Sequence, residues 1–209
     1  MIMNSNYFDE DYFERGIETG KSGYQNYHWI PELTIPFTMA MIDYLGINRY
    51  DTVLDWGCAK GYTVKALRML GRLSWGVDIS PYALRNIDHE VEKYCCHVEF
   101  LMKYYFDFCI AKDVFEHIPI EQLKNTLNRI DAGKLFVIVP LGKDGKYNAH
   151  INNLDKSHII CKPSDWWVDF FEKNNWCVSS YTTHIDGIKE SYRGIPEAHG
   201  FFTLRRKYC

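Results

Sequence analysis

The chain has 209 residues, of which 46% are hydrophobic and 24% are charged, and its formal net charge is -3. This composition is that of a globular protein rather than a disordered one, and the length suits a single α/β domain. The small negative charge gives no overall attraction to phosphates, so nucleic acid is not expected as a partner unless a local basic patch binds it.

The sequence contains an odd number of cysteines, seven in all. They are Cys58, Cys95, Cys96, Cys109, Cys161, Cys177 and Cys209. The first residues lack the pattern of a secretory signal, and no stretch approaches the roughly 20 apolar residues of a membrane helix. We therefore expect free thiols, a cytoplasmic location and no membrane association. Cys95, Cys96 and His97 form the one local cluster of candidate metal ligands, but adjacent residues on a strand point to opposite faces, so no metal site is expected.

Residues 1–30 are rich in polar and aromatic side chains and precede the regular pattern of the rest of the chain. We expect them to form an accessory N-terminal segment, followed by one domain over residues 31–209. Pro31 favours the start of a helix, apolar residues follow it at helical spacing, and Gly46 ends the pattern.

Short apolar runs then alternate with helical patterns. Strands are expected at 51–55, 73–78, 106–111 and 134–139, with a less distinct third strand at 96–101. Helices are expected at 62–70, from 80 onward, at 119–130 and at 164–173, and two antiparallel edge strands at 176–184 and 199–207. Residues 140–162 are expected to form a long loop, which in a compact domain is usually functional or mobile. Repeated strand–helix units predict an α/β fold with a parallel sheet covered by helices on both faces, and such sheets bind ligands at the carboxyl ends of their strands.

The stretch 53–61, VLDWGCAKG, joins an apolar strand to a helix through a loop that contains two glycines. Gly57 and Gly61 allow the backbone to approach a ligand closely, and the helix N-terminus suits a carboxylate. Asp55, at the end of the strand, can face an ammonium group. Asp78 follows about 20 residues later, at the end of the next strand, where a carboxylate can accept both hydroxyls of a ribose. The alternative is a tight strand–helix turn in which Asp78 only caps a helix.

The stretches VLDWGCAKG and WGVDIS (75–80) resemble the first two motifs of class I S-adenosylmethionine (SAM)-dependent methyltransferases. FDFCIAKDVFEHI (106–118) and GKLFVIVPLG (133–142) resemble the fourth and fifth strands of that family, so the likeness covers roughly residues 50–142 and continues into the late strands. It implies a Rossmann-like, seven-stranded, mostly parallel sheet whose last strand is antiparallel, with SAM as the cofactor. The residues expected to bind SAM are Asp55, Gly57, Cys58, Gly61, Tyr62, Asp78, Ile79, Lys112 and Tyr27.

The sequence departs from the family pattern at two places. Ala59 stands where the middle glycine of the loop is common. The connection between the third and fourth strands is short, and the acidic residue that usually contacts adenine has only Glu99 as a substitute. A nicotinamide-binding protein is a weaker alternative, because the loop lacks the G-x-G-x-x-G spacing and is preceded by an acid.

Candidate catalytic residues follow the fourth and fifth strands. Asp113 and His117 come directly after the fourth strand, and His158 lies in the long loop after the fifth. A hydroxyl group that accepts the methyl group must lose its proton, so a histidine or carboxylate beside the methyl group would assist the reaction. The alternatives are that Glu116 and His117 form a structural turn and that His158 is a surface residue.

The segment 20–29, GKSGYQNYHW, mixes glycines with aromatic and hydrogen-bonding side chains. We expect it to fold over the cofactor as a lid that excludes water, the alternative being a simple cover for the outer helices. The whole pattern predicts a SAM-dependent methyltransferase that acts on a small polar acceptor, such as a hydroxyl or amine of a sugar or another metabolite. A nucleic-acid methyltransferase and a non-catalytic SAM-binding module are the alternative functions.

Overall fold

The computed structural model describes residues 5–207 and contains a seven-stranded sheet, so residues 1–4 and the two C-terminal residues, Cys209 among them, lie outside the description. The strands of the sheet are β1 (Thr52–Trp56), β2 (Leu73–Asp78), β3 (Cys95–His97), β4 (Phe106–Lys112), β5 (Ala132–Pro140), β8 (Trp176–Thr182) and β9 (His199–Arg206). Their spatial order is β3-β2-β1-β4-β5-β9-β8, and β9 runs antiparallel to both of its neighbours. The predicted fold class, a mostly parallel seven-stranded sheet with an antiparallel last strand, is therefore confirmed.

One part of the strand prediction was wrong. Residues 176–184 and 199–207 were both expected to be edge strands, but only β8 lies at the edge, because β9 inserts between β5 and β8. The pairing of β9 with two strands also changes the role of its basic end. Arg206 lies over the C-terminal end of α6 (Ile120–Arg129), where its guanidinium donates to the carbonyls of Leu127 and Ile130.

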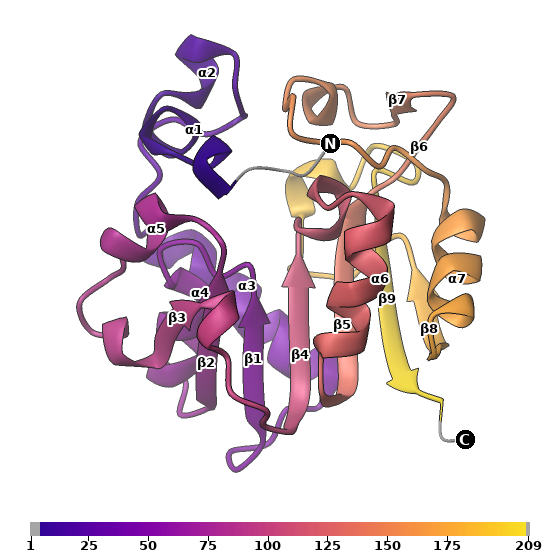
Figure 1. Ribbon diagram of the computed structural model, residues 1–209. Helices are drawn as coiled ribbons and strands as arrows, with labels where there is room; N and C mark the ends of the chain where they lie inside the picture. The colour runs from indigo at the N-terminus through magenta and orange to yellow at the C-terminus, as the bar shows by residue number, and fades with distance from the viewer. Residues whose placement is uncertain (1–4, 208–209) are drawn as a thin grey trace.

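Helices cover both faces of the sheet (Figure 1). They are α1 (Glu10–Glu14), α2 (Gly16–Thr19), α3 (Pro31–Leu45), α4 (Tyr62–Met69), α5 (Pro81–Arg85), α6 (Ile120–Arg129) and α7 (Ser164–Lys173). Neighbouring residues of a strand point to opposite faces, so Leu54 packs in the core beneath α6 and α7, whereas Val53 packs in the core beneath α3 and α4. Apolar side chains on both faces explain why the central strands have continuous apolar sequences.

The region around the third strand is shorter than predicted. Residues 96–101 were expected as a strand, but β3 spans only Cys95–His97 and a 3-10 turn over Val98–Phe100 follows it. β3 pairs only with β2, through three residue pairs, and the chain then turns back toward β4. The turn places the buried Val98 beside the carboxyl ends of the strands.

The loop over residues 140–162 contains structure that was not predicted. A small hairpin pairs β6 (Gly142–Lys143) with β7 (Lys146–Tyr147), and a 3-10 turn covers His150–Asn153. The hairpin turn is Asp144-Gly145, and both residues have positive φ angles, 52° and 77°. An Asp-Gly pair in this conformation is a favoured two-residue hairpin turn, so the signal was present in the sequence.

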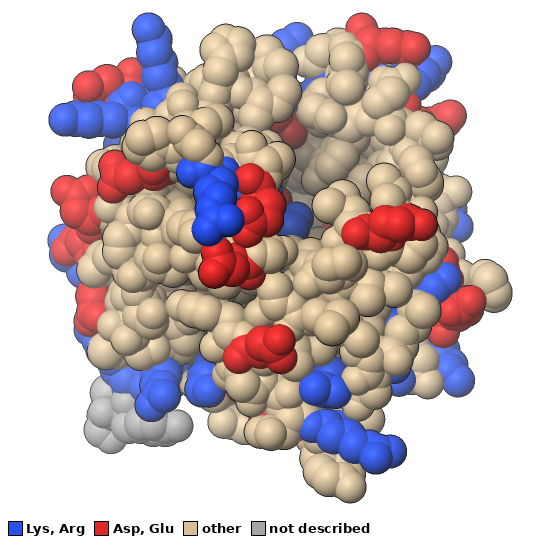
Figure 2. Space-filling model, turned by 180° about the vertical axis from the view of Figure 1, so that it is seen from behind, with Lys and Arg blue, Asp and Glu red and all other residues tan. Residues whose placement is uncertain are grey.

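The N-terminal helices α1 and α2 lie above the carboxyl ends of the parallel strands (Figure 1). None of the helices among residues 5–207 is long and apolar enough to cross a membrane. The six described cysteines are all free thiols. Many Lys and Arg side chains lie along the lower edge of the molecule seen from behind, away from the edge that carries α1 and α2, and acidic side chains lie among the basic ones higher up (Figure 2).

Candidate functional site

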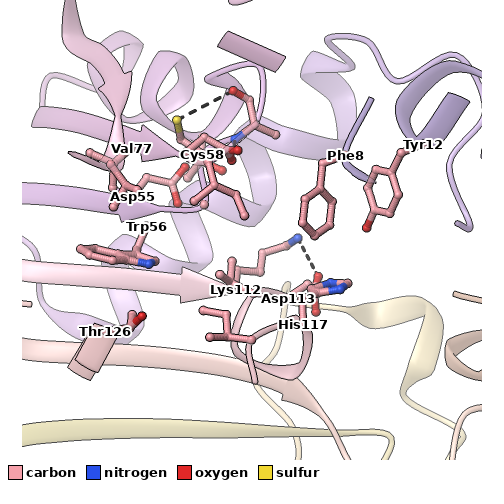
Figure 3. Close-up of a pocket in the computed structure, with 18 of the residues that line it drawn as sticks. Phe8, Tyr12, Asp55, Trp56, Cys58, Val77, Lys112, Asp113, His117 and Thr126 are labelled. Atoms are coloured by element: carbon pink, nitrogen blue, oxygen red, sulfur yellow. Dashed lines mark hydrogen bonds and ion pairs between the residues drawn. The ribbon is translucent and has the colours of Figure 1, made fainter. Parts of the chain in front are cut away.

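A pocket of about 350 Å³ lies at the carboxyl ends of β1, β2 and β4 (Figure 3). Its walls come from the glycine-bearing loop, the ends of the three strands, α6 and the N-terminal segment. The predicted site residues that line it are Asp55, Gly57, Cys58, Asp78, Ile79, Lys112, Asp113, His117 and Tyr27. The volume lies within the range of small-molecule sites, roughly 300–1,000 Å³. The fold thus brings most of the predicted residues into one concave site.

The glycine-bearing loop takes left-handed backbone conformations that bring it close to its neighbours. Gly57 has a φ of 86°, and a Cβ built on it would lie 2.4 Å from Cγ2 of Val114. Ala59 also has a positive φ, 48°, so the alanine adopts the backbone conformation that glycine would take more easily. Gly61, with a φ of 79°, forms the N-cap of α4. The loop is therefore shaped by its backbone more than by its side chains.

Asp55 and Asp78 line the same pocket from neighbouring strands. Asp78 accepts hydrogen bonds from the backbone N–H groups of Ala59 and Ser80, each at 2.7 Å. Burial raises the pKa of Asp78 in spite of these donors. Burial also raises the pKa of Asp55 to about 7, although the ammonium group of Lys112 acts in the opposite direction. A cationic or hydrogen-bonding ligand that stabilises the charged carboxylates would therefore be favoured here.

Asp113 forms ion pairs with two lysines next to the pocket. Lys112 Nζ lies 2.9 Å and Lys189 Nζ 2.6 Å from Asp113 Oδ2. Burial opposes ionisation, but the two ammonium groups outweigh it and hold the pKa of Asp113 well below its usual range. Asp113 is thus a poor proton acceptor, and its main effect is to fix Lys112 between the two ends of the pocket (Figure 3).

The N-terminal segment forms one wall of the pocket with aromatic side chains. The contributing residues are Phe8, Tyr12, Phe13, Tyr24 and Tyr27. Lys60 holds this segment to the glycine-bearing loop, because its Nζ lies 2.6 Å from Glu14 Oε1 and donates to the carbonyl of Tyr27 at 2.7 Å. The hydroxyl of Ser80 donates to the carbonyl of Phe8. The segment is thus fastened directly over the carboxyl ends of the strands.

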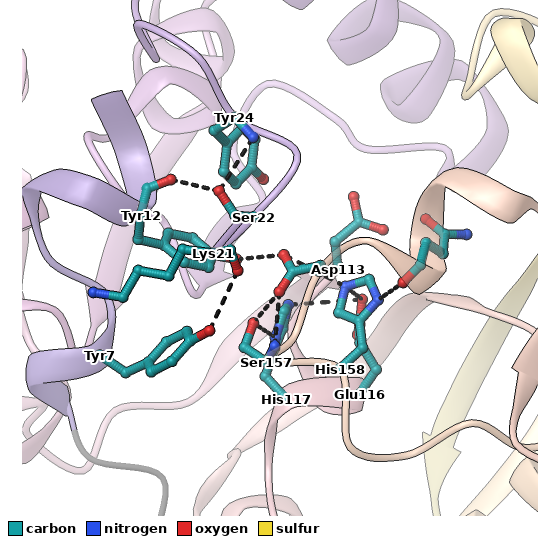
Figure 4. Close-up of polar contacts among 12 residues, drawn as sticks. Tyr7, Tyr12, Lys21, Ser22, Tyr24, Asp113, Glu116, His117, Ser157 and His158 are labelled. Atoms are coloured by element: carbon teal, nitrogen blue, oxygen red, sulfur yellow. Dashed lines mark hydrogen bonds and ion pairs between the residues drawn. The ribbon is translucent and has the colours of Figure 1, made fainter. Parts of the chain in front are cut away.

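Glu116, His117 and His158 meet at the other end of the pocket (Figure 4). Their ligand atoms all lie within 4.8 Å of one another. Burial lowers the pKa of His117 to about 4, and it lowers the pKa of His158 as well, so both imidazoles are neutral near pH 7. Burial and the charge of Asp113 raise the pKa of Glu116 well above its usual range. His117 lines the pocket, and the ring of His158 lies beyond it at 4.7 Å between centroids.

Three predicted residues are not part of the pocket wall: Gly61, Tyr62 and His158. Gly61 is the N-cap of α4. The ring of Tyr62 packs on Tyr27 and Trp29, at 5.3 and 5.9 Å between centroids, and so supports the N-terminal segment from behind. Glu99, the substitute considered for an adenine contact, is also absent from the wall, and its side chain is 76% exposed.

Sequence reasoning missed several residues of the wall. The main ones are Trp56, Thr63, Val98, Gln122, Asn125, Thr126 and Arg129. Four of these are polar residues on one side of α6, and a polar helix side normally indicates contact with solvent. Phe8, Tyr12 and Phe13 lie within residues 1–30, the expected N-terminal lid or accessory segment, but they were not singled out, although the aromatic composition of residues 7–13 was a usable signal.

Residues 54–132 match the family model described as "Methyltransferase domain". That span contains the glycine-bearing loop, both acids at the strand ends, and the Glu116-His117 pair. No curated protein matches the chain by sequence.

Solved methyltransferase structures share the fold at low sequence identity. Magnesium protoporphyrin IX methyltransferase from Synechocystis PCC 6803, with bound S-adenosylhomocysteine (SAH), has a TM-score of 0.62 and 15% identity, over 97% of each chain. A SAM-dependent methyltransferase from Clostridium acetobutylicum has a TM-score of 0.60 and 10% identity, over 86% of this chain and 93% of its own. The 1,6-didemethyltoxoflavin-N1-methyltransferase of Burkholderia thailandensis has a TM-score of 0.56 and 16% identity, over 83% and 77%. Residues 54–132 thus match a methyltransferase domain, and the chain has the fold of class I SAM-dependent methyltransferases.

Proposed function

We propose that the pocket binds SAM between the glycine-bearing loop and the N-terminal segment. Asp55 would face the methionyl ammonium group, and Asp78 would accept the ribose hydroxyls. The loop at Gly57 and Cys58 and the start of α4 at Gly61 would accommodate the methionyl carboxylate. Ile79 would contact the adenine, and Tyr27 and Lys112 would border the methionyl part.

The residues present fit this cofactor. The Asp78 carboxylate already accepts two backbone hydrogen bonds, one on each oxygen, and each oxygen keeps a second lone pair for a ribose hydroxyl. The buried Asp55 carboxylate has no ion pair of its own among the described residues, so an ammonium group would satisfy it. The apolar side chains of Ile79, Val98 and Ile118 in the wall suit a flat heterocycle.

We further propose that the acceptor is a small polar molecule. The observation that carries this proposal is the pocket, which is lined by Asp55, Asp78 and His117 and by aromatic side chains of the N-terminal segment. A methyl group on the cofactor would face the other end of the pocket, where Tyr12, Tyr24 and His117 leave room for a compact acceptor. The formal net charge of -3 gives no overall attraction to a nucleic acid.

SAM supplies a methyl group that its sulfonium already activates. The chain's own residues have to orient the acceptor and to exclude water, which the aromatic lid does by covering the strand ends. A hydroxyl acceptor must also lose its proton. Of the two neutral imidazoles, His117 lines the pocket and would accept it, and His158 lies behind His117. Asp113 would instead position Lys112, because its carboxylate forms ion pairs with the ammonium groups of Lys112 and Lys189.

We propose that the protein is located in the cytoplasm, which is a reducing compartment. All six described cysteines are free thiols, and Cys58 lies in the pocket wall. Thiols of this kind persist in reducing compartments.

The test is methyl transfer from SAM with an isotope-labelled methyl group to two separate pools, one of small hydroxyl and amine compounds and one of RNA and DNA oligonucleotides. We expect label in the small-molecule pool, with formation of SAH, and loss of both in Asp55→Asn. Label in the oligonucleotide pool alone would contradict the proposed acceptor. Failure of SAM to bind the wild-type chain would contradict the proposal as a whole.

A further inference from the structure

The cluster of Glu116, His117 and His158 has the composition of a metal site. Nε2 of His158 lies 3.9 Å from Glu116 Oε1, and Nε2 of His117 lies 4.0 Å from the same oxygen. Glu116 and His117 belong to a 3-10 turn after β4, whereas His158 comes from the loop that follows β7. The loop is held there because the backbone N–H groups of Ile159 and Ile160 donate to the carbonyl of Glu116, at 2.8 and 3.0 Å. Two segments thus present three potential ligands to one point.

Glu116 is the observation that points to a missing partner. Its side chain is fully buried, and neither carboxylate oxygen has a hydrogen bond to another residue among those described. Buried carboxylates are normally paired, hydrogen-bonded or bound to a metal, because an unpaired buried polar group is costly. The two imidazoles that flank the carboxylate are too far away to be its hydrogen-bond partners, since both distances exceed 3.5 Å.

Both imidazoles are oriented so that a free lone pair faces Glu116. Nδ1 of His158 lies 2.8 Å from the carbonyl oxygen of Asn152, which can only accept, so Nδ1 carries the proton and Nε2 does not. Nδ1 of His117 lies 2.8 Å from the hydroxyl of Ser157, and that hydroxyl donates its own proton to Asp155. Ser157 therefore accepts from Nδ1 of His117, and Nε2 of His117 is also free. Metal-binding histidines are commonly fixed in this way by a partner on the other ring nitrogen.

We propose that Glu116, His117 and His158 bind one divalent transition-metal ion, for which Zn²⁺ is the best-suited probe. Two imidazole nitrogens and one carboxylate oxygen are a ligand set that suits Zn²⁺ and related ions better than Mg²⁺ or Ca²⁺, which prefer oxygen ligands. Ligand atoms about 2.1 Å from a tetrahedral ion lie about 3.4 Å apart. The three ligand atoms lie within 4.8 Å of one another, so small shifts of the side chains toward one another would close the site. Three protein ligands leave a coordination position open, and His117 places the ion at the wall of the pocket.

A bound metal ion, rather than His117 or His158, would then assist the loss of the proton from a hydroxyl acceptor. Coordinated Nε2 atoms cannot accept a proton, whereas a hydroxyl near a divalent cation ionises more easily. This consequence rests on the proposed function, but metal binding itself does not, and the test below needs neither SAM nor an acceptor.

A second group of possible metal ligands could also bind ions in a titration, so its contribution has to be removed. His184, Asp186 and Glu190 also lie close together. This group is on the surface, and Asp186 is already paired with both His184 and Arg193. A His184→Ala chain removes it and serves as the background for every titration.

The experiment starts from the full chain, stripped with a chelator that is then removed. Zn²⁺ is titrated by calorimetry, and Co²⁺ by its visible absorption, which reports the ligands around the ion. We expect one equivalent to bind tightly to the His184→Ala chain. Glu116→Gln and His158→Ala should each abolish this step, and Ser157→Ala, which removes the partner of His117, should weaken it about 10–100-fold.

The inference is overturned if the stripped chain binds no Zn²⁺ or Co²⁺ equivalent, or if Glu116→Gln and His158→Ala bind as the background does. Circular dichroism checks that each variant is folded. If a variant does not fold, the Co²⁺ spectrum of the background chain decides: nitrogen and oxygen ligation supports the site, and a spectrum of hydrated Co²⁺ overturns it. SAH binding to the same samples, measured separately, reports on the proposed function, so the two failures are distinguishable.

Discussion

The two ends of the pocket differ in how the chain builds them. At the cofactor end, the polar groups come from two short stretches, 55–61 and 78–80, each lying at the carboxyl end of one of two adjacent strands. At the acceptor end, His117 and Glu116 meet His158, which comes from a loop held by hydrogen bonds to the Glu116 carbonyl. The N-terminal segment covers both ends and is fastened to each of them. The first end is fixed by local backbone geometry, and the second by contacts between distant parts of the chain.

Apart from removal of the Asp78 carboxylate, the largest effect on the cofactor end is expected from Gly57→Ala. A side chain at this φ of 86° costs about 1–2 kcal/mol, and its Cβ would also collide with Val114. Displacement of the loop should lower SAH affinity by more than about tenfold, a change of about 1.4 kcal/mol in binding free energy. Calorimetric titration with SAH measures this change.

Gly71→Ala is the matched control for this substitution. Gly71 has a similar φ, 73°, and a Cβ there would meet no atom within 4 Å. We expect it to lower the free energy of unfolding and to leave SAH affinity unchanged. Equal SAH affinities in the two variants would show that the backbone of the loop does not shape the cofactor end.

The pH dependence of SAH binding should be the next largest effect. Burial raises the pKa of Asp55 to about 7, so the carboxyl group is protonated in the free protein below that pH. Binding of an ammonium group favours the ionised form, and the proton must then be released. Affinity should therefore rise up to about tenfold per pH unit from about pH 5 to about pH 7 and level off above it.

Titrations in buffers of different ionisation enthalpy measure the released proton directly. In Asp55→Asn the affinity should be lower and should no longer change over this pH range. A wild-type affinity that stays constant between about pH 5 and about pH 8 would place the ammonium group away from Asp55.

Smaller effects should separate the two attachments of the lid. Lys60→Met removes the contacts to Glu14 and to the Tyr27 carbonyl at the cofactor end. Tyr12→Phe removes the hydrogen bond from the tyrosine hydroxyl to Asp155 Oδ2, 3.1 Å long, at the acceptor end. Each lost contact is worth about 0.5–3 kcal/mol. We expect Lys60→Met to weaken SAH binding several-fold, and Tyr12→Phe to raise the KM for the acceptor without changing SAH affinity.

Lys21→Met is the control for the lid, because the partner of Lys21 is Asp9, within the same segment. It should leave both binding constants unchanged. If Lys60→Met and Tyr12→Phe change the same constant, the lid acts as one rigid cover and the two attachments are not separate.

The parts of the fold and of the site that depend on short stretches of sequence could be predicted. The strand–loop–helix at 53–61 and the acid that ends β2 could be identified, because alternating strands and helices bring their carboxyl ends to one edge of the sheet. The insertion of β9 between β5 and β8 could not be read from its own residues, because an interior and an edge strand have similar patterns here. The meeting of His158 with Glu116 depends on the path of a long loop, and that path is set by backbone hydrogen bonds with no local sequence signal.

SAH calorimetry on Asp78→Ala, with Asp107→Ala beside it, tests the central claim most directly. Both carboxylates accept two hydrogen bonds, but Asp107 bonds to Thr52 at the opposite end of the sheet from the pocket. Two hydrogen bonds to a charged group are worth about 1.5–3 kcal/mol each. SAH should therefore bind the wild type and Asp107→Ala alike and Asp78→Ala at least about 100-fold more weakly. Equal binding by all three chains, or no binding by the wild type, would contradict the assignment of the pocket to the cofactor.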